Sequence, residues 1–211
     1  MTLKIINKIK YLLISNSILR NIIVFNYYKY YKKNTNFYNH SDLHKIGFIS
    51  GTDKYDKWHS FKNISYLDIY HQYFKNYKRN KINILELGVK NGSSLKTWQN
   101  YFKQATVVGL DMNANCKKFE NKNTHIYIGR QEDNKLSNKI INRYNYFDII
   151  IDDASHINEL TIKSFKLYFP HLNKSGIYIL EDMTTTYEDL NKVIGKWDGE
   201  LIKNKESWIA A

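Results

Sequence analysis

An uninterrupted β-branched run that leads straight into acidic residues constrains this 211-residue chain more than any other feature. The stretch FDIIIDDASH, residues 147–156, places three consecutive isoleucines before Asp152, Asp153 and His156. Such a short apolar run is typical of a central strand that is buried on both faces of a parallel sheet. Ligands of open α/β sheets bind beyond the carboxyl ends of the strands, so these polar residues are predicted to lie at a ligand site.

A second stretch, IYILEDM, has the same character and ends in Glu181 and Asp182. If the two strands are neighbours, their carboxylates and the imidazole of His156 converge on one crevice. So much like charge in one place requires a bound cation or altered protonation.

The rest of the chain alternates between strand and helix patterns, with a fifth strand at residues 177–180. Further strands are predicted at residues 82–89, 105–111 and 124–129, and helices at residues 64–76, 95–102, 134–145 and 159–169. Pro170 and Gly176 are expected to bracket a turn. This alternation predicts an α/β fold with a doubly wound, mostly parallel sheet.

Residues 39–59 read as a polar loop, with Gly47 and Gly51 marking turns. Within it, Thr52, Asp53 and Lys54 offer a hydroxyl, a carboxylate and an ammonium in a row.

The first predicted strand runs through Gly88 into a turn at Gly92 and Ser93, just before a helix. Backbone N–H groups at such a turn face a ligand, although the glycines match the dinucleotide pattern GxGxxG poorly. The second strand ends in Asp111, the position at which an acid accepts hydrogen bonds from a ribose diol.

The formal net charge of +12 is compatible with a nucleic-acid or membrane-surface partner. Lysine, asparagine, isoleucine and tyrosine are abundant throughout, however, which indicates a general compositional bias, and no nucleic-acid-binding motif accompanies the charge. The single cysteine, Cys116, excludes an internal disulfide framework and a cysteine-based zinc cluster. A reducing, cytoplasmic location is therefore expected.

Residues 1–38 predict one or two basic helices whose apolar positions recur at helical spacing. No apolar run reaches the roughly 20 residues that a bilayer span needs, and no small-residue cleavage site follows as in a signal peptide. Three interpretations stay open: packing against the catalytic domain or a second subunit of a homo-oligomer, a peripheral membrane contact, or a flexible leader.

Taken together, ILELGVKNGSSL, VVGLD, FDIIIDDASH and SGIYILEDM resemble the class I S-adenosylmethionine-dependent methyltransferases, which have a Rossmann-like sheet. Within that class the chain is most similar to the magnesium-dependent sugar O-methyltransferases of macrolide and related polyketide antibiotic pathways. The resemblance covers about residues 43–190 and depends on the combination of GTDK, Gln-x-Asp, DDxSH and ED in this order. The predicted organisation is therefore a basic helical extension at 1–38 and a methyltransferase domain at 39–211.

The resemblance also implies how S-adenosylmethionine would be bound. Gly88 would let the backbone approach the methionine part, Asp111 would bind the ribose, and Gln131 with Asp133 would lie near the adenine. The TDK triplet would close over the cofactor from the N-terminal side. The full set of cofactor-binding candidates is Thr52, Asp53, Lys54, Glu86, Gly88, Ser93, Asp111, Gln131, Asp133 and Asp152.

By the same resemblance, Mg²⁺ would be held by Asp153, Glu181 and Asp182, with Mn²⁺ as the alternative ion, and His156 would be the general base. Oxygen ligands do select such hard cations. A cation beside a sugar hydroxyl lowers its pKa toward the range in which a histidine accepts the proton, so Asp153 and His156 are the catalytic candidates.

Simpler interpretations exist for the same residues. Asp152 can be a helix N-cap, the other acids a surface cluster, and His156 an ordinary loop histidine. Tyr187 either touches substrate or lies on a helix face.

Only 29 residues follow Asp182, enough for a short helix and one strand, so the C-terminal end is predicted to be shortened and the last hairpin of the class to be absent or incomplete. Three functions follow. The first is metal-dependent O-methylation of a sugar or glycoside, or of another small polar acceptor. The second is a catalytically weak methyltransferase-like binding or assembly module. Nucleic-acid methylation ranks last, because no base-holding motif is present.

Overall fold

The structure is a computed structural model that describes residues 40–55, 60–61, 64–182, 201–204 and 207–210. The described residues from Asp42 onward belong to one compact unit. The predicted helices of residues 1–38, and Tyr187, lie outside the described residues. The division at residue 38 therefore stays a prediction.

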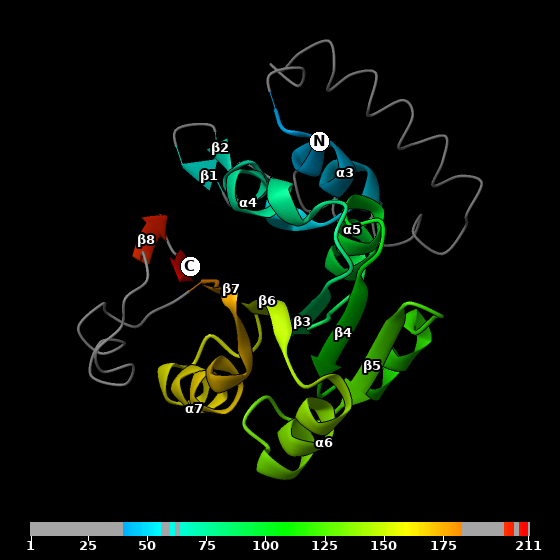
Figure 1. The fold of residues 1–211 in the computed structure, drawn as a ribbon, viewed down its shortest axis with the longest axis vertical. Coiled ribbons are helices and arrows are strands. Elements are labelled where there is room, and N and C mark those ends of the chain that lie inside the picture. Colours follow the sequence, from blue (N-terminus) through cyan, green and yellow to red (C-terminus); the bar gives the residue numbers. More distant parts are fainter. Residues whose placement is uncertain (1–39, 56–59, 62–63, 183–200, 205–206, 211) are drawn as a thin grey trace, which may run out of the picture. The chain divides into compact units, whose positions relative to one another are not determined.

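The centre of this unit is a seven-stranded sheet in the order β5-β4-β3-β6-β7-β9-β8 (Figure 1). The first five of these strands are parallel, and β9 and β8 are antiparallel to their neighbours. The predicted fold class is confirmed, with the isoleucine-rich strand β6 paired between β3 and β7. The strands are β3 (Asn83–Leu87), β4 (Thr106–Asp111), β5 (Thr124–Ile128), β6 (Phe147–Asp152), β7 (Leu172–Leu180), β8 (Leu201–Asn204) and β9 (Ser207–Ala210).

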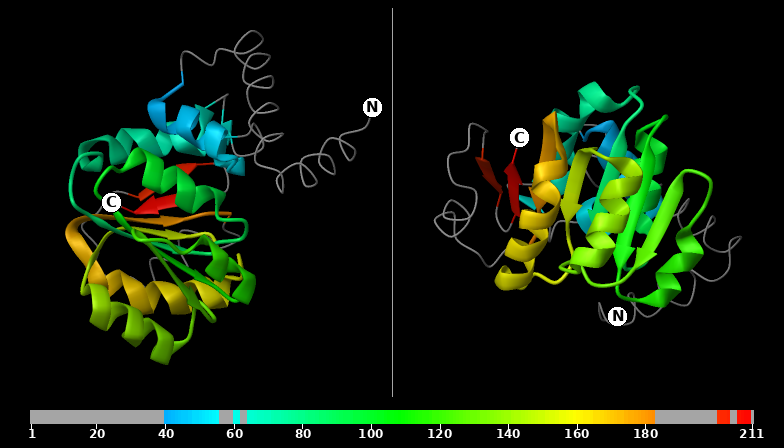
Figure 2. Two further views of the ribbon diagram at one scale, coloured as in Figure 1. Left: turned by 90° about the vertical axis from the view of Figure 1, so that its right-hand side faces the viewer. Right: turned by 60° about the horizontal axis from the view of Figure 1, so that its bottom comes forward.

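Helices cover both faces of the sheet, as Figure 2 shows from the side. One layer contains α3 (Asp42–Ser50), α4 (Tyr66–Phe74) and α5 (Ser93–Tyr101), and the other contains α6 (Asn134–Tyr144) and α7 (Asn158–Tyr168). Short 3₁₀ turns are η2 (Asp53–Tyr55), η4 (Lys75–Tyr77), η5 (Ala114–Phe119) and η6 (Phe169–His171), and a small separate ribbon pairs β1 (Ser60–Phe61) with β2 (Ile64–Ser65).

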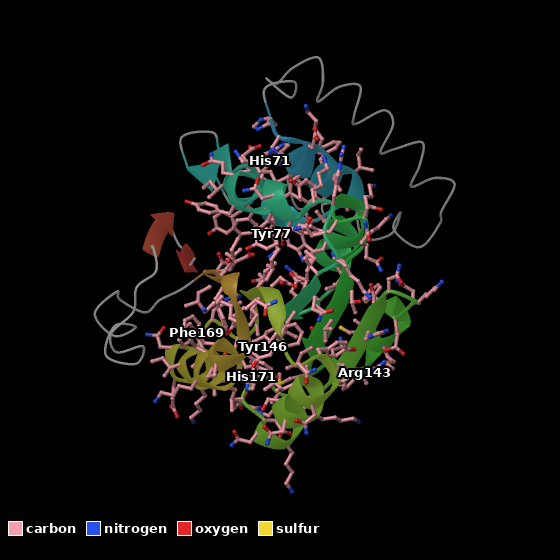
Figure 3. All side chains as sticks on the ribbon, viewed as in Figure 1. His71, Tyr77, Arg143, Tyr146, Phe169 and His171 are labelled. Atoms are coloured by element: carbon pink, nitrogen blue, oxygen red, sulfur yellow. The ribbon has the colours of Figure 1, made fainter. Side chains whose placement is uncertain are left out.

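Alternation along the strands produces two separate cores. In β6, Ile149 and Ile151 pack with the α3–α5 layer, whereas Ile150 packs with the α6–α7 layer. Figure 3 shows side chains on both sides of the sheet, with Tyr77 on the α4 side and Phe169 on the α7 side. The core under α3–α5 is rich in aromatic side chains, including the fully buried Trp98.

The prediction of a polar loop across residues 39–59 is wrong over its first half, because Asp42–Ser50 forms α3. Gly47 was taken as a turn signal, but it lies inside this helix at a contact with α4. A Cβ on Gly47 would lie 2.1 Å from Leu67 Cδ1, so a larger residue here would require the Leu67 side chain to move. Gly51 does mark the turn after the helix, at φ +83°.

The expectation of an absent or incomplete last hairpin is also wrong. β8 and β9 form an antiparallel pair, and β9 pairs with β7 from Tyr178 to Leu180. Each strand has only four residues, which is too short for a clear strand pattern in the sequence. The hairpin covers the β7 edge that would otherwise be exposed.

β7 starts five residues before the predicted strand, and Gly176 lies inside it instead of in a turn. The pairing with β6 passes from Phe147↔Leu172 to Ile149↔Ile177, so β7 carries extra residues at this point. The turn residues therefore mark a bulge in the strand. Among the described helices, none is long and apolar enough to cross a bilayer.

Candidate active site

The backbone ladder continues one residue past the ends of the central strands. Gly88 N–H donates to Leu110 O, Asp153 N–H to Leu87 O and Glu181 N–H to Asp152 O, at 2.8–3.0 Å. Asp153 and Glu181 are thus fixed in register immediately beyond neighbouring strands. The predicted convergence of the two acidic strand ends is confirmed by the β6–β7 pairing.

Successive residues along a strand point to opposite faces, and this separates the two adjacent aspartates. Asp153 contacts Lys54, on the α3–α5 side of the sheet. Asp152 contacts Ser164 of α7 at 2.5 Å, on the other side. The pair DD in the sequence therefore supplies two different sites, a consequence that the alternation itself would have predicted.

Lys54 lies at the centre of the acidic cluster. Its ammonium donates to Asp153 Oδ2 and, at 2.6 Å, to Glu181 Oε2. The side chain is 3% exposed. Burial acts to lower the pKa of Lys54, but the carboxylates of Asp153 and Glu181 outweigh it and hold the pKa well above its usual range. Lys54 is buried among the proposed metal ligands, and its expected closure over the cofactor stays a prediction.

Two tyrosines of α4 donate hydrogen bonds to Glu181 and Asp182. Tyr70 Oη donates to Glu181 Oε1 at 2.8 Å, and Tyr66 Oη donates to Asp182 Oδ1 at 3.2 Å. The sequence predicted this helix, at residues 64–76, but gave neither tyrosine a role at the site. The available signal was their i, i+4 spacing, because a buried tyrosine hydroxyl normally requires a partner.

Asp182 and His156 both adopt the left-handed backbone conformation, at φ +52° and +55°. Non-glycine residues seldom occupy it, and such strain is concentrated at functional sites. One oxygen of Asp153, one of Asp182 and one ring nitrogen of His156 lie within 4.8 Å of one another. His156 Nε2 is 3.7 Å from Asp153 Oδ1 and the side chain is 39% exposed. The structure thus joins Asp153, Asp182 and His156 directly, whereas both Glu181 oxygens contact Lys54 or Tyr70.

Glu86 is a further acid on the α3–α5 face, and it is fully buried. Ser94 Oγ and Trp98 Nε1 both donate to its Oε2, at 2.8 and 3.1 Å. Among the described residues, Oε1 has no hydrogen-bond partner. Burial raises the pKa of Glu86 to about 7, against the opposing effect of Lys54. An unpartnered buried acceptor of this kind fits a ligand or a cation.

Gly88 and Asp111 shape the neighbouring surface at the ends of β3 and β4. A Cβ on Gly88, whose φ is +92°, would lie 2.1 Å from the Asp153 carbonyl oxygen. Asp111 accepts backbone N–H bonds from Val89, Lys90 and Asn113 at 2.8–2.9 Å. Burial works against the charge, but these donors hold the pKa of Asp111 below its usual range. The carboxylate is therefore ionised and fixed, as a ribose acceptor requires.

Gln131 and Asp133 have structural contacts. Gln131 is buried; its Nε2 donates to Asp152 and Ser164, and its Oε1 accepts from Ser155 N at 3.0 Å. Asp133 caps α6, with Oδ1 accepting from Lys135 N and Leu136 N. Placement of these two residues near an adenine stays a prediction.

The alternative that Asp152 is a helix N-cap is wrong. Asp152 ends β6, and the N-cap of α7 is Ile157, which makes no side-chain cap bond. Burial raises the pKa of Asp152 to about 7, and the Ser164 hydroxyl opposes this shift.

Three further cofactor candidates lie around the turn between β3 and α5. Thr52 is buried, Asp53 is exposed and pairs with Lys90 Nζ at 3.1 Å, and Ser93 begins α5. They share the sheet edge with Gly88 and Asp111, and their contact with a cofactor stays a prediction.

Comparison of sequences finds relatives among O-methyltransferases, although no family model matches the chain. The chain is 34% identical over 125 residues to a demethylmacrocin O-methyltransferase of Streptomyces fradiae, which covers 56% of the chain and 31% of that enzyme. It is 36% identical over 125 residues to a mycinamicin VI 2''-O-methyltransferase of Micromonospora griseorubida, and the match again covers 56% of the chain and 31% of that enzyme. The chain thus spans about a third of the length of these curated relatives. The resemblance predicted from the motifs is confirmed.

Among solved structures, the MycE methyltransferase of the mycinamycin biosynthetic pathway, in complex with Mg and SAH, superposes with a TM-score of 0.69. The match has 24% identity and covers 82% of this chain and 55% of MycE. The calicheamicin methyltransferase CalS11 gives a TM-score of 0.53 at 14% identity, over 68% of this chain and 76% of that one. The fold is therefore the Rossmann-like fold of class I methyltransferases.

Proposed function

We propose that this protein is a metal-dependent O-methyltransferase that moves a methyl group from S-adenosylmethionine to a hydroxyl of a sugar or glycoside. The observation that supports it most is the convergence of Asp153, Asp182 and His156 at the carboxyl ends of β6 and β7. A fold match alone does not define an activity, whereas acids and a base within 4.8 Å of one another supply the chemistry.

The residues present fit both implied groups. Carboxylate oxygens on Asp153, Glu181 and Asp182 form a donor set for a hard divalent cation, and the Lys54 ammonium between two of them marks a position that accepts positive charge. For S-adenosylmethionine, Gly88 lets the end of β3 approach the Asp153 backbone closely, and Glu86 Oε1 is an unused buried acceptor. Asp111 is fixed for a ribose.

When bound, these groups supply an electrophilic methyl on a sulfonium and a lowered pKa of a nearby hydroxyl. His156 accepts the proton of the acceptor hydroxyl at Nε2, and the Asp153 carboxylate 3.7 Å away stabilises the resulting imidazolium. The acceptor oxygen bonds to the methyl carbon as the carbon–sulfur bond breaks, which leaves a neutral thioether. Tyr66 and Tyr70 keep Asp182 and Glu181 in place during the methyl transfer.

The sugar or glycoside as acceptor rests on the named relatives, one of which is a rhamnosyl-tetracenomycin C 2'-O-methyltransferase of Streptomyces olivaceus. Methylation of another small polar acceptor stays an alternative. The assembly-module hypothesis depended on an incomplete C-terminal hairpin, and the β8–β9 pair removes that argument. A cytoplasmic location stays a prediction.

Calorimetry tests the proposal directly. S-adenosylhomocysteine should bind the full chain, Mg²⁺ should bind separately, and EDTA should abolish methyl transfer in a screen of glycosides and nucleotide sugars. Binding of neither molecule would refute the proposal. Transfer that is unaffected by EDTA would refute its metal dependence.

A further inference from the structure

Lys54 occupies a position between two proposed metal ligands. It comes from η2, 99 residues before Asp153 and 127 before Glu181, yet its buried ammonium bridges these two carboxylates. Both are proposed metal ligands. A divalent cation that uses the same oxygens must therefore displace the ammonium or share the carboxylates with it.

The structure also provides a second carboxylate for a displaced ammonium. Glu86 acts electrostatically on Lys54, lies on the same face of the sheet and is fully buried. Its Oε2 accepts both neutral donors, whereas Oε1 has no partner among the described residues. The lysine stem has four methylene groups with rotatable bonds, which give its ammonium a range of positions.

We infer that Lys54 is a built-in cation that holds the acidic cluster together without metal and moves toward Glu86 when a divalent cation binds to Asp153 and Glu181. The inference rests on the metal site of the proposed function and makes Lys54 and Glu86 positioning residues for that site. Neither ligates the metal, yet each changes its affinity, in opposite directions.

Two independent observations support this exchange over a purely structural ion pair. Asp182 and His156 lie beside Asp153 and adopt strained backbone conformations. One ligand atom of each of the three residues lies within 4.8 Å of the others, so a cation that displaces Lys54 has further donors nearby. The Tyr70 hydroxyl donates to Glu181 Oε1, whereas Lys54 donates to Oε2. The Glu181 carboxylate therefore keeps its position when Lys54 leaves.

The test is a double-mutant cycle on the full chain, with Mg²⁺ affinity measured by calorimetry in the absence of cofactor. Lys54→Met should bind Mg²⁺ about 10- to 100-fold more tightly, because the competing ammonium is gone. Glu86→Gln should bind it at least about fivefold more weakly, because the displaced ammonium loses its acceptor. Lys90→Met is the matched control, since Lys90 is an exposed lysine near the same sheet edge. The Mg²⁺ affinity of this variant should equal that of the wild-type protein.

The double variant separates displacement from simple charge proximity. If Glu86 acts by receiving Lys54, the Glu86→Gln effect should largely vanish in the Lys54→Met background. An equal effect in both backgrounds means that Glu86 acts only through its charge, and overturns the inference. Unchanged or weaker Mg²⁺ binding by Lys54→Met also overturns it, as does the absence of Mg²⁺ binding by the wild-type protein.

Thermal unfolding gives a readout that needs no metal affinity. In EDTA, Lys54→Met should unfold about 10 °C or more below the wild-type protein, because it leaves buried carboxylates uncompensated, and Mg²⁺ should restore the difference. If Lys54→Met does not fold even with Mg²⁺, Lys54→Gln takes its place in the cycle. If the protein does not bind S-adenosylhomocysteine but shows these Mg²⁺ effects, the methyltransferase proposal is refuted and this inference still stands.

Discussion

The two faces of the sheet stabilise buried acids in different ways. On the α3–α5 face, Asp153 and Glu181 pair with a charged lysine. On the α6–α7 face, Asp152 contacts only the neutral donors Ser164 and Gln131 among its described side-chain partners. A charge-compensated cluster can exchange one cation for another, whereas an acid held by hydroxyl and amide donors is locked in place. Among the described residues, the contrast predicts that cation chemistry belongs to the α3–α5 face.

The largest expected effect on Mg²⁺ affinity separates the adjacent aspartates. Asp153→Asn should weaken Mg²⁺ binding by about a hundredfold or more, because loss of a ligand exceeds the 10- to 100-fold cost of losing a supporting contact. Asp152→Asn should keep Mg²⁺ affinity within a few-fold of the wild-type value, since its side chain is on the other face. Calorimetry compares the two, and equal losses would contradict the division between the faces.

His156 tests whether the exposed end of the cluster is a base. His156→Ala should slow methyl transfer by about two to four orders of magnitude, the usual contribution of a positioned general base. Mg²⁺ affinity should change little, and higher pH should partly restore the rate as hydroxide replaces the base. Single-turnover rates across pH check this. A large loss of Mg²⁺ affinity would instead show that His156 is a metal ligand.

Glu86, on the α3–α5 face, makes the free energy of unfolding depend on pH. Burial raises the pKa of Glu86 from 4.5 to about 7, so the folded state binds a proton that the unfolded state releases between these values. Its contribution to stability is complete below about pH 4.5 and is lost as pH rises toward 7, by up to about 3 kcal/mol.

Glu86→Gln should therefore flatten this part of the curve of unfolding free energy against pH. It should also be more stable than the wild-type protein above pH 7. Chemical denaturation between pH 4.5 and 8.5 measures the effect. A steeper dependence in the variant would show that the Glu86 carboxylate is ionised in the folded protein.

The smallest effect compares one tyrosine hydroxyl from each face. Tyr70→Phe removes the hydrogen bond to Glu181 and should cost about 1.5–3 kcal/mol, as for hydrogen bonds to charged groups. Tyr168→Phe is the matched control, because the Tyr168 hydroxyl is buried without a partner among the described residues. It should be neutral or slightly stabilising. Urea unfolding of both variants checks the difference, and equal costs would contradict it.

Much of the candidate site was predictable because its residues directly follow strands with strong patterns. The position of Asp111 and the convergence of Asp153 with Glu181 follow from strand ends and parallel pairing. The opposite orientation of Asp152 also follows from the two-residue period of a strand, although the sequence interpretation did not apply it. The partners of these acids were not predictable, because Lys54 and Tyr70 come from elements far away in the chain.

The sequence by itself determined the five parallel strands, their intervening helices and the acids at their carboxyl ends, since β-branched runs and helical periodicity are local signals. Only the tertiary structure decided that Gly47 sits inside a helix, where close contact with Leu67 overrides its turn preference. It also decided the β8–β9 hairpin, whose four-residue strands depend on pairing with β7. Above all, it placed the ammonium of Lys54 between two carboxylates more than 90 residues away, because a buried charge is stable only beside its opposite.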